Sequence, residues 1–247
     1  MLKILFATSE VHPLIKTGGL ADVSAGLPIA LSKLGHQVRL VLPAYQQIMQ
    51  QVTVKNTLSK FSVPGIVGEI EILECKLPGT EIKVLLVNYA AAFDRPGNPY
   101  INPNGSPWPD NAERFYLFCR AIQALATDNA NINWRPDILH CNDWQTGLAP
   151  AFLQKETIRP ATLFSIHNLA YQGLYSHSTF VSLGLPSDLW QSSGLEFHGQ
   201  FSFIKGGIVY SHRINTVSPT YMEEIKTTIF GFGLEGLLKY RQRVCSG

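Results

Sequence analysis

The stretch Ser9–Pro28, SEVHPLIKTGGLADVSAGLP, joins an apolar segment to an amphipathic one and decides the fold. The segment before it, Leu2–Thr8, is the apolar run expected of a buried strand. Beyond the glycines, apolar residues recur every three or four positions and predict a helix with one apolar face, at Leu20, Val23, Leu27, Leu31 and Leu34. Gly35 stands where a helix C-terminal cap favours glycine. The unit is therefore a strand, a glycine-rich loop and a helix.

Strand and helix patterns alternate along the rest of the chain. Further strands are expected within His36–Tyr45, Pro136–Asn142, Pro160–Asn168 and His212–Ser218, and further helices over about Asp110–Thr127, Gln145–Glu156 and Pro219–Lys226. This alternation predicts an α/β fold with a doubly wound, Rossmann-like parallel sheet. A β-hairpin insertion is expected within Gly68–Asn88, around Pro78-Gly79, followed by a long surface loop over residues 91–109.

The amino-acid composition excludes several classes of function for this chain. The 247 residues are 45% hydrophobic and 15% charged, which is ample material for a core of one large domain or two small ones. A net charge of +2 gives no support for a nucleic-acid or anionic-membrane surface. The four cysteines form no CxxC pair, which argues against a metal site and is typical of reduced thiols in the cytoplasm. We expect no signal peptide and no membrane span.

Polar residues follow three of the predicted strands. Lys16 lies in the loop after the first strand, Asn142, Asp143 and Trp144 follow the strand at Pro136–Asn142, and His167 with Asn168 ends the next one. Parallel strands place their carboxyl ends at one edge of the sheet, where α/β folds bind their ligands. We therefore expect these residues, distant in sequence, to meet in one crevice.

The Lys16-Thr17-Gly18-Gly19 loop has the chemistry of a phosphate site. A helix N-terminus presents free N–H groups and partial positive charge, glycines allow close approach of backbone, and lysine adds a full charge. The alternative is a tight turn whose glycines only satisfy backbone geometry. Neither the Walker A spacing nor GxGxxG is present, which disfavours a nucleoside triphosphatase and a nicotinamide-dependent dehydrogenase.

Six blocks in order make the chain resemble the first domain of bacterial glycogen synthases and plant starch synthases. These blocks are KTGGLADV (16–23), DNAERF (110–115), HCNDWQTGL (140–148), HNLAYQG (167–173), KGGIVYSHRINTVSPTY (205–221) and GFGLEGLL (231–238). The resemblance implies one half of a GT-B architecture and a retaining glucosyltransferase. The reaction it implies is transfer of glucose from ADP-glucose to the 4-hydroxyl at the non-reducing end of an α-1,4-glucan, with no cofactor and no metal.

The resemblance also implies roles for single residues. Lys16, Gly18 and Gly19 would hold the donor's phosphates, and His167 would contact the transferred glucose. Asp22 would orient the sugar or act as a first-turn acid, and Asn168 is a weaker donor-side candidate. Asp143 would lie near the sugar and the acceptor, or else cap the helix beginning near Gln145. On the acceptor side, Tyr100 would stack on glucan or pin its loop, and Trp144 would be a sugar platform or core.

All the matching blocks belong to the family's first domain, so residues 1–247 are expected to be that acceptor-side domain without the nucleotide-sugar domain. We expect the chain alone to be close to inactive, because groups from both walls of the cleft stabilise the transition state. The alternative is a non-catalytic glucan-binding or regulatory module, or half of a split enzyme. An exposed apolar patch near Leu234–Leu238 would favour a domain that packs against another; a polar surface there would favour an independent module.

Overall fold

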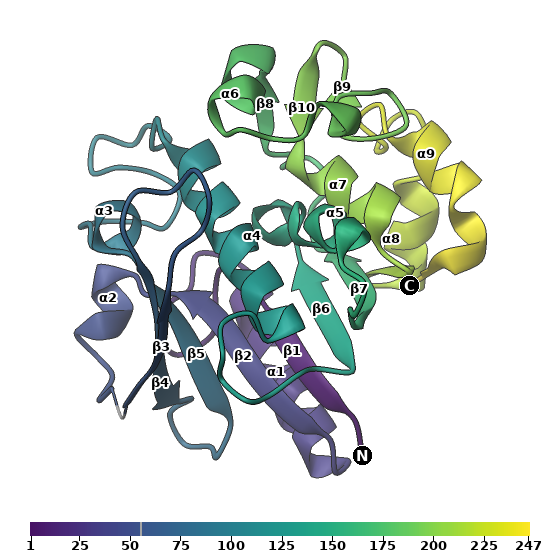
Figure 1. The fold of residues 1–247 in the computed structure, drawn as a ribbon. Helices are drawn as coiled ribbons and strands as arrows, with labels where there is room; N and C mark the ends of the chain where they lie inside the picture. The colour runs from purple at the N-terminus through teal and green to yellow at the C-terminus, as the bar shows by residue number, and fades with distance from the viewer. Residues whose placement is uncertain (55) are drawn as a thin grey trace.

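A mixed β-sheet forms the centre of the molecule in the computed structural model, which describes residues 1–54 and 56–247 (Figure 1). Within these residues the sheet has nine strands, in the order β12 (Cys245–Ser246), β11 (Arg213–Thr216), β7 (Ala161–Ile166), β6 (Ile138–Asn142), β1 (Lys3–Ala7), β2 (Gln37–Pro43), β5 (Lys83–Asn88), β4 (Ile70–Lys76) and β3 (Asn56–Phe61). The strands from β12 to β5 are parallel, whereas β4 and β3 are antiparallel to their neighbours. The predicted α/β sheet and its hairpin insertion are thus confirmed.

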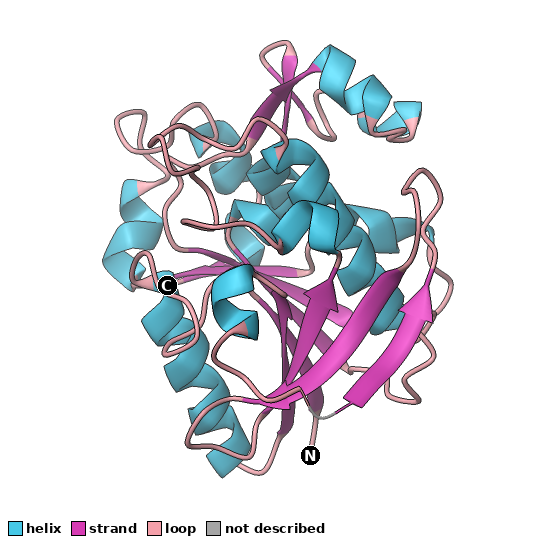
Figure 2. Cartoon of the chain, turned by 90° about the vertical axis from the view of Figure 1, so that its left-hand side faces the viewer, coloured by secondary structure: helices cyan, strands magenta, loops and turns pink. Residues whose placement is uncertain are grey.

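Helices lie on both sides of this sheet (Figure 2). They are α1 (Leu20–Lys33), α2 (Gln46–Met49), α3 (Ala90–Phe93), α4 (Asn111–Thr127), α5 (Ala149–Phe152), α6 (His177–Ser182), α7 (Phe203–Tyr210), α8 (Pro219–Glu224) and α9 (Glu235–Tyr240). Short 3-10 helices are η1 (Trp144–Thr146), η2 (Leu153–Lys155), η3 (Ser187–Leu189) and η4 (Gln242–Val244). A small antiparallel sheet of β8 (Leu174–Ser176), β10 (Gln200–Ser202) and β9 (Glu196–Phe197) lies beside α6, at the top of Figure 1.

The order of the strands places the topological switch point between β1 and β6. On one side the chain runs from β1 to β2, out to the edge strand β3 and back through β4 to β5. It then crosses to β6 and runs through β7 to β11 on the other side. The crevice beyond the carboxyl ends of such a strand pair is the usual ligand site of an open α/β sheet. The glycine loop follows β1, and Asp143 follows β6, so both candidates lie at this point.

The predicted apolar face of α1 is confirmed in part, since Leu20 is buried and Leu27 and Leu31 pack partly buried against the core. The side chains buried in α1 are Leu20, Ala21, Ser24, Ala25 and Pro28. By contrast, Val23 is 38% and Leu34 75% exposed. Small residues allow the helix to approach the sheet closely, and Ser24 Oγ is hydrogen-bonded to Thr8 Oγ1 at 2.9 Å at the end of β1. The helix does end as predicted, with Gly35 at a left-handed φ of +88°.

Two other expected segments differ from the structure. The helix expected over Gln145–Glu156 is broken into η1, α5 and η2, because Pro150 lacks an N–H and Gly147 makes a tight approach to α7. The loop expected at the surface over residues 91–109 begins with the end of α3, where Phe93 is fully buried. In both cases tertiary packing overrides the local sequence pattern.

Gly147 is required by this close packing and gives a first testable prediction. A Cβ on Gly147 would lie 2.0 Å from the carbonyl oxygen of Phe203, which is backbone of α7 and cannot rotate away. We expect Gly147→Ala to lower the free energy of unfolding by about 3 kcal/mol or more, as overpacking of a core does. In Gly26→Ala, an exposed α1 position with nothing within 4 Å, helix propensity should instead raise stability by about 0.5–1 kcal/mol. Equal denaturation midpoints for the two variants would contradict this packing.

Candidate functional site

Direct contacts join the ends of β1, β6 and β7. Asn142, the last residue of β6, donates its Nδ2–H to the carbonyl of Ala7 at 3.0 Å. Its Oδ1 lies 3.0 Å from Nε2 of His167, which follows β7. Asp143 accepts hydrogen bonds on Oδ1 from the backbone N–H of His167 at 2.8 Å and of Asn168 at 3.4 Å. The expected meeting of these strand ends is therefore present in the structure.

The glycines of the Lys16–Gly19 loop are not explained by backbone geometry. Neither Gly18 nor Gly19 has a positive φ, and a Cβ on either would have no atom within 4 Å. In the described part of the chain, α1 has no side-chain cap at its N-cap residue Gly19. Open space therefore lies beside an uncapped helix N-terminus, as an anion site requires.

Lys16 pairs with Asp22 beside this space. Its Nζ lies 2.8 Å from both carboxylate oxygens of Asp22, and the two side chains are about half exposed. An exposed pair of this kind contributes little to stability, so Lys16 can exchange its partner for a bound anion at small cost. Asp22 lies in the first turn of α1, where a carboxylate also interacts favourably with the helix dipole.

The backbone at Asp143 is strained, and its side chain does not cap the helix that follows. Its φ of 56° and ψ of 179° lie in a region that residues other than glycine rarely adopt. The side chain makes no hydrogen bond to the first turn of η1, so the helix-cap interpretation of Asp143 is wrong. The strained turn instead aims the carboxylate across the sheet edge at the chain after β7.

Burial raises the pKa of the Asp143 carboxyl to about 7. The N–H groups of His167 and Asn168 oppose this rise by stabilising the carboxylate, and the nearby charge of Glu10 adds to it. Asp143 therefore changes charge near neutral pH, as groups with perturbed pKa values at functional sites often do.

His167 is held as a neutral imidazole with a defined tautomer. Asn142 turns its Oδ1 toward the ring because its Nδ2 donates to Ala7, so Nε2 of His167 carries the hydrogen and Nδ1 keeps a free lone pair. Burial lowers the pKa of His167 to about 4, against a small opposing effect of Glu10. The site thus presents an uncharged histidine at neutral pH.

Glu10 is a buried carboxylate that the residue-by-residue prediction missed. It is 3% exposed and accepts hydrogen bonds from Thr17 N, Thr17 Oγ1, Gly18 N and the hydroxyl of Tyr100. Its position in the sequence could have identified it, because a charged residue soon after a buried strand lies at the edge of the sheet where ligands bind. Asn142 was seen at a strand end, but its role in orienting His167 is visible only in three dimensions.

Tyr100 and Trp144 are anchored on the protein as well as lying near the site. The Tyr100 hydroxyl is 2.6 Å from Glu10 Oε1 and 2.7 Å from Ser9 Oγ, which matches the loop-pinning alternative for this residue. The Trp144 ring packs edge-on against Phe115 at 4.9 Å and Phe203 at 5.7 Å between ring centres. The acceptor roles of both residues stay predictions.

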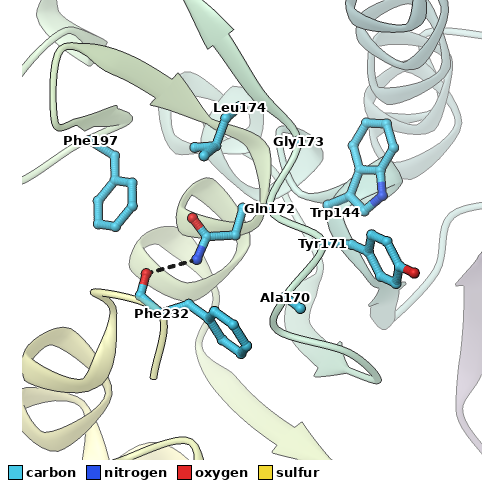
Figure 3. Close-up of a pocket in the computed structure, with 8 residues that line it drawn as sticks. All are labelled: Trp144, Ala170, Tyr171, Gln172, Gly173, Leu174, Phe197 and Phe232. Atoms are coloured by element: carbon cyan, nitrogen blue, oxygen red, sulfur yellow. Dashed lines mark hydrogen bonds between the residues drawn. The ribbon is translucent and has the colours of Figure 1, made fainter. Parts of the chain in front are cut away.

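A cavity of about 480 Å³ lies beside Trp144 (Figure 3). Its lining consists of Trp144, Ala170, Tyr171, Gln172, Gly173, Leu174, Phe197 and Phe232. Gln172 Nε2 donates to the carbonyl of Phe232 at 3.1 Å and holds two walls together. The Tyr171 ring, 66% exposed, stands at the rim, so the cavity offers aromatic surface to a ligand.

The side chains of Leu234 and Leu238, where an exposed apolar patch would favour a domain that packs against another, are buried. Leu234 and Leu238 are 1% and 0% exposed, because this segment turns them inward where α9 packs on α7. Exposed apolar side chains lie just before it instead, at Ile229, Phe230 and Phe232. Exposed apolar surface is therefore present near this segment, beside the cavity, which favours a domain that packs against another.

Residues 1–54 and 56–247 contain neither a cluster of metal-ligand side chains nor a membrane-spanning helix. No group of three or more histidine, cysteine or carboxylate side chains among them is placed to hold a metal ion. Likewise, no helix in these ranges has both the length and the apolar character needed to cross a bilayer.

Comparison with known proteins places these features in a family. A family model described as the starch synthase catalytic domain matches residues 3–240. The chain is 53% identical over 246 residues to glycogen synthase 1 of Methylococcus capsulatus, and 52% identical over 247 residues to glycogen synthase of Thioalkalivibrio sulfidiphilus. All of this chain is covered in both cases, but only 49% and 51% of the relatives. The chain thus spans about half the length of the curated relatives it matches.

A solved structure agrees with this result. The catalytic domain of starch synthase IV from Arabidopsis thaliana, bound to ADP and acarbose, superposes with a TM-score of 0.86 at 28% identity. The match covers 100% of this chain and 51% of that one.

Proposed function

The chain belongs to the family of starch synthase catalytic domains, and from that premise we propose that it forms one wall of a retaining glucosyltransferase site. The reaction proposed is transfer of glucose from ADP-glucose to the 4-hydroxyl at the end of an α-1,4-glucan. The observation that carries it is the convergence, at the β1/β6 switch point, of an open glycine loop with a neutral histidine and the half-buried carboxylate of Asp143.

The loop after β1 is the proposed phosphate side of the donor site. Lys16 would leave Asp22 to bind the diphosphate, and the open space at Gly18 and Gly19 would admit it next to the N-terminus of α1. Glu10 already takes the Gly18 N–H, so the N–H groups offered to phosphate are those of Gly19 and the first turn of α1. Asn168, exposed at the end of β7, lies on the same edge.

His167 and Asp143 are the proposed sugar side of the donor site. As the bond from the glucose C1 to the diphosphate breaks, positive charge develops on the sugar ring. A neutral imidazole does not repel that charge, and the free lone pair on Nδ1 can face it. Asp143 fixes the position of His167 through its backbone N–H, and its carboxylate adds negative charge at the edge of the same site.

The cavity beside Trp144 is the proposed place for the acceptor glucan. Aromatic side chains bind the apolar faces of sugars, and Trp144, Tyr171 and Phe232 line this space. The Arabidopsis neighbour, bound to ADP and acarbose, supports a nucleotide and a glucan-like ligand in this family. Because the relatives are about twice as long, we propose that a separate nucleotide-binding domain forms the opposite wall of the cleft, giving a GT-B architecture.

A cytoplasmic location is proposed on the cysteines alone. Cys75, Cys119, Cys141 and Cys245 are all free thiols in the structure, as is usual in a reducing compartment.

Lys16→Ala tests this function. The assay is a chimera in which this chain replaces the segment it aligns with in Methylococcus capsulatus glycogen synthase 1, supplied with ADP-glucose and maltoheptaose. We expect glucose incorporation, and a loss of about 10-fold or more in kcat/KM on Lys16→Ala, because a charge on the diphosphate is removed. Lys33→Ala, an exposed lysine in the last turn of the same helix, is the matched control and should leave the rate unchanged.

Two outcomes would contradict the proposal. A chimera that folds and binds maltoheptaose but transfers no glucose would favour the non-catalytic glucan-binding alternative. Equal rates for Lys16→Ala and the unaltered chimera would remove the loop from the donor site.

A further inference from the structure

Glu10 has no place in the proposed chemistry, although it is the most heavily bonded carboxylate near the site. Its Oε2 accepts from Thr17 N at 2.5 Å and Gly18 N at 3.2 Å, and its Oε1 accepts from Thr17 Oγ1 and the Tyr100 hydroxyl, each at 2.6 Å. Four donors on one buried carboxylate form a strong, directional clamp, because hydrogen bonds to a charged group are about twice as strong as neutral ones. Glu10 therefore fixes the backbone that leads into Gly18 and Gly19.

Tyr100, which binds the Glu10 carboxylate, is itself fixed by hydrogen bonds that lead to α4. The Tyr100 carbonyl accepts hydrogen bonds from Trp108 N at 3.1 Å and from Asn111 Nδ2 at 2.9 Å. Asn111, in the first turn of α4, in turn accepts on Oδ1 from Arg114 Nη1 at 2.7 Å. These groups are buried or half-buried, so a continuous hydrogen-bond chain runs from the glycine loop to α4.

Arg114 closes this chain against two further backbone segments. Its guanidinium donates to the carbonyls of Ala92 at 2.7 Å and Pro99 at 2.9 Å, and the side chain is 2% exposed. The chain that leads into Tyr100 from α3 is thereby held at Ala92 and at Pro99. Movement of Tyr100 away from Glu10 would break several bonds at once.

We propose that Glu10 is a positioning residue, whose carboxylate holds the Lys16–Gly19 loop against Tyr100 so that the donor's phosphates meet a preformed site. This inference rests on the proposed function for the identity of the anion. Preformed donors bind an anion without the entropic cost of ordering the loop first. Loss of the clamp should therefore weaken donor binding more than it slows the chemical step.

Amide hydrogen exchange in the 247-residue chain tests the clamp without any substrate. In Glu10→Ala we expect the Thr17 and Gly18 amides to exchange at least about 10-fold faster, because both lose a bond to a charged acceptor. Glu10→Gln should recover much of this protection, since one amide oxygen can still accept both N–H groups while the two hydroxyls reverse to accept from Nε2. Tyr100→Phe removes only the hydrogen bond from the Tyr100 hydroxyl to Glu10, so the exchange rate of the same two amides should rise by a smaller factor.

Glu74→Gln is the matched control. Glu74 is also a buried carboxylate, 8% exposed, but it pairs with Lys83 in the hairpin insertion. The variant Glu74→Gln should therefore leave the exchange rates of the Thr17 and Gly18 amides unchanged. Unaltered exchange at these amides in a folded Glu10→Ala, or in Tyr100→Phe, would overturn the proposal.

Kinetics in the chimera separate positioning from a general loss of folded protein. We expect Glu10→Ala to raise the KM for ADP-glucose about 10- to 100-fold with kcat changed by less than about 3-fold, and Glu10→Gln to restore most of the KM. A purely structural role would lower the amount of active protein and leave KM unchanged, which would overturn the proposal. If the chimera transfers no glucose, the proposed function fails, while amide exchange still decides the role of Glu10.

Discussion

Replacing His167 with alanine is expected to lower kcat/KM for glucosyl transfer by about 100- to 1,000-fold, the cost of removing one preorganised group that stabilises transition-state charge. The imidazole is held by Asn142, whose own amide is fixed on Ala7, so its Nδ1 lone pair has a defined direction. Because burial lowers the pKa of His167 to about 4, the group is neutral throughout the physiological range. The measurement is glucose incorporation into maltoheptaose by the chimera.

Two further variants accompany His167→Ala: one at a control histidine, and one at the residue that orients the imidazole. His177→Ala alters an exposed histidine at the start of α6, where it packs edge-on against Trp190, and should leave the rate unchanged. Asn142→Leu should lower the rate by about 10-fold or more, because the imidazole loses the partner that orients it. A rate for His167→Ala within threefold of the unaltered chimera would exclude the histidine from the reaction.

Asp143→Ala is expected to impair both stability and transfer. The backbone N–H groups of His167 and Asn168 lose their acceptor, and alanine is strained at a φ of 56°, so the free energy of unfolding should fall by about 2–4 kcal/mol. Activity should fall by about 100-fold or more, because His167 is no longer held at the sheet edge. Chemical denaturation and the incorporation assay measure the two effects.

Asp143→Asn separates the hydrogen bonds of Asp143 from its charge. The amide oxygen can accept both N–H groups, and asparagine tolerates a positive φ, so most of the stability should return. Activity should stay low if the carboxylate charge is needed at the site. Full activity in Asp143→Asn would show that only the hydrogen bonds matter.

The pH dependence of stability follows from the raised pKa of Asp143. A carboxyl with a raised pKa in the folded state contributes stability that is present at low pH and lost as pH rises through about 7. Between the ordinary pKa of 3.8 and the raised value of about 7, the unaltered chain should therefore lose stability relative to Asp143→Asn as the pH rises, by up to about 1.4 kcal/mol per pH unit, and above about pH 8 the difference should stay constant. Parallel stability curves for the two proteins over this range would contradict the assignment.

Much of the fold could be predicted because the strand signals are local. The strands β1, β2 and β5 carry continuous apolar runs, and the Pro78-Gly79 turn marks the hairpin. The burial of Ala21, Ser24 and Ala25 beside the predicted apolar face of α1 could not be predicted, because it depends on the packing of the helix, as the contact of Ser24 with Thr8 shows. The break at Gly147 has the same origin in a contact with α7.

The functional site, like the fold, could be predicted from the sequence only in part. Strand ends and the parallel sheet were enough to place the Lys16 loop, Asp143 and His167 together. The clamp by Glu10 and the orientation of His167 by Asn142 depend on side chains that meet across the sheet edge. Which apolar side chains near Leu234–Leu238 are exposed could not be read from the sequence, because it depends on how α9 packs.

Titration of ADP-glucose into the isotope-labelled chain, followed by amide NMR, tests most directly whether the ends of β1, β6 and β7 form one donor site. The site described here predicts the largest shifts at Lys16–Asp22, Asp143 and His167–Asn168, all saturating with a single dissociation constant. Shifts confined to one of these segments, separate dissociation constants, or shifts centred on the hairpin insertion would contradict it.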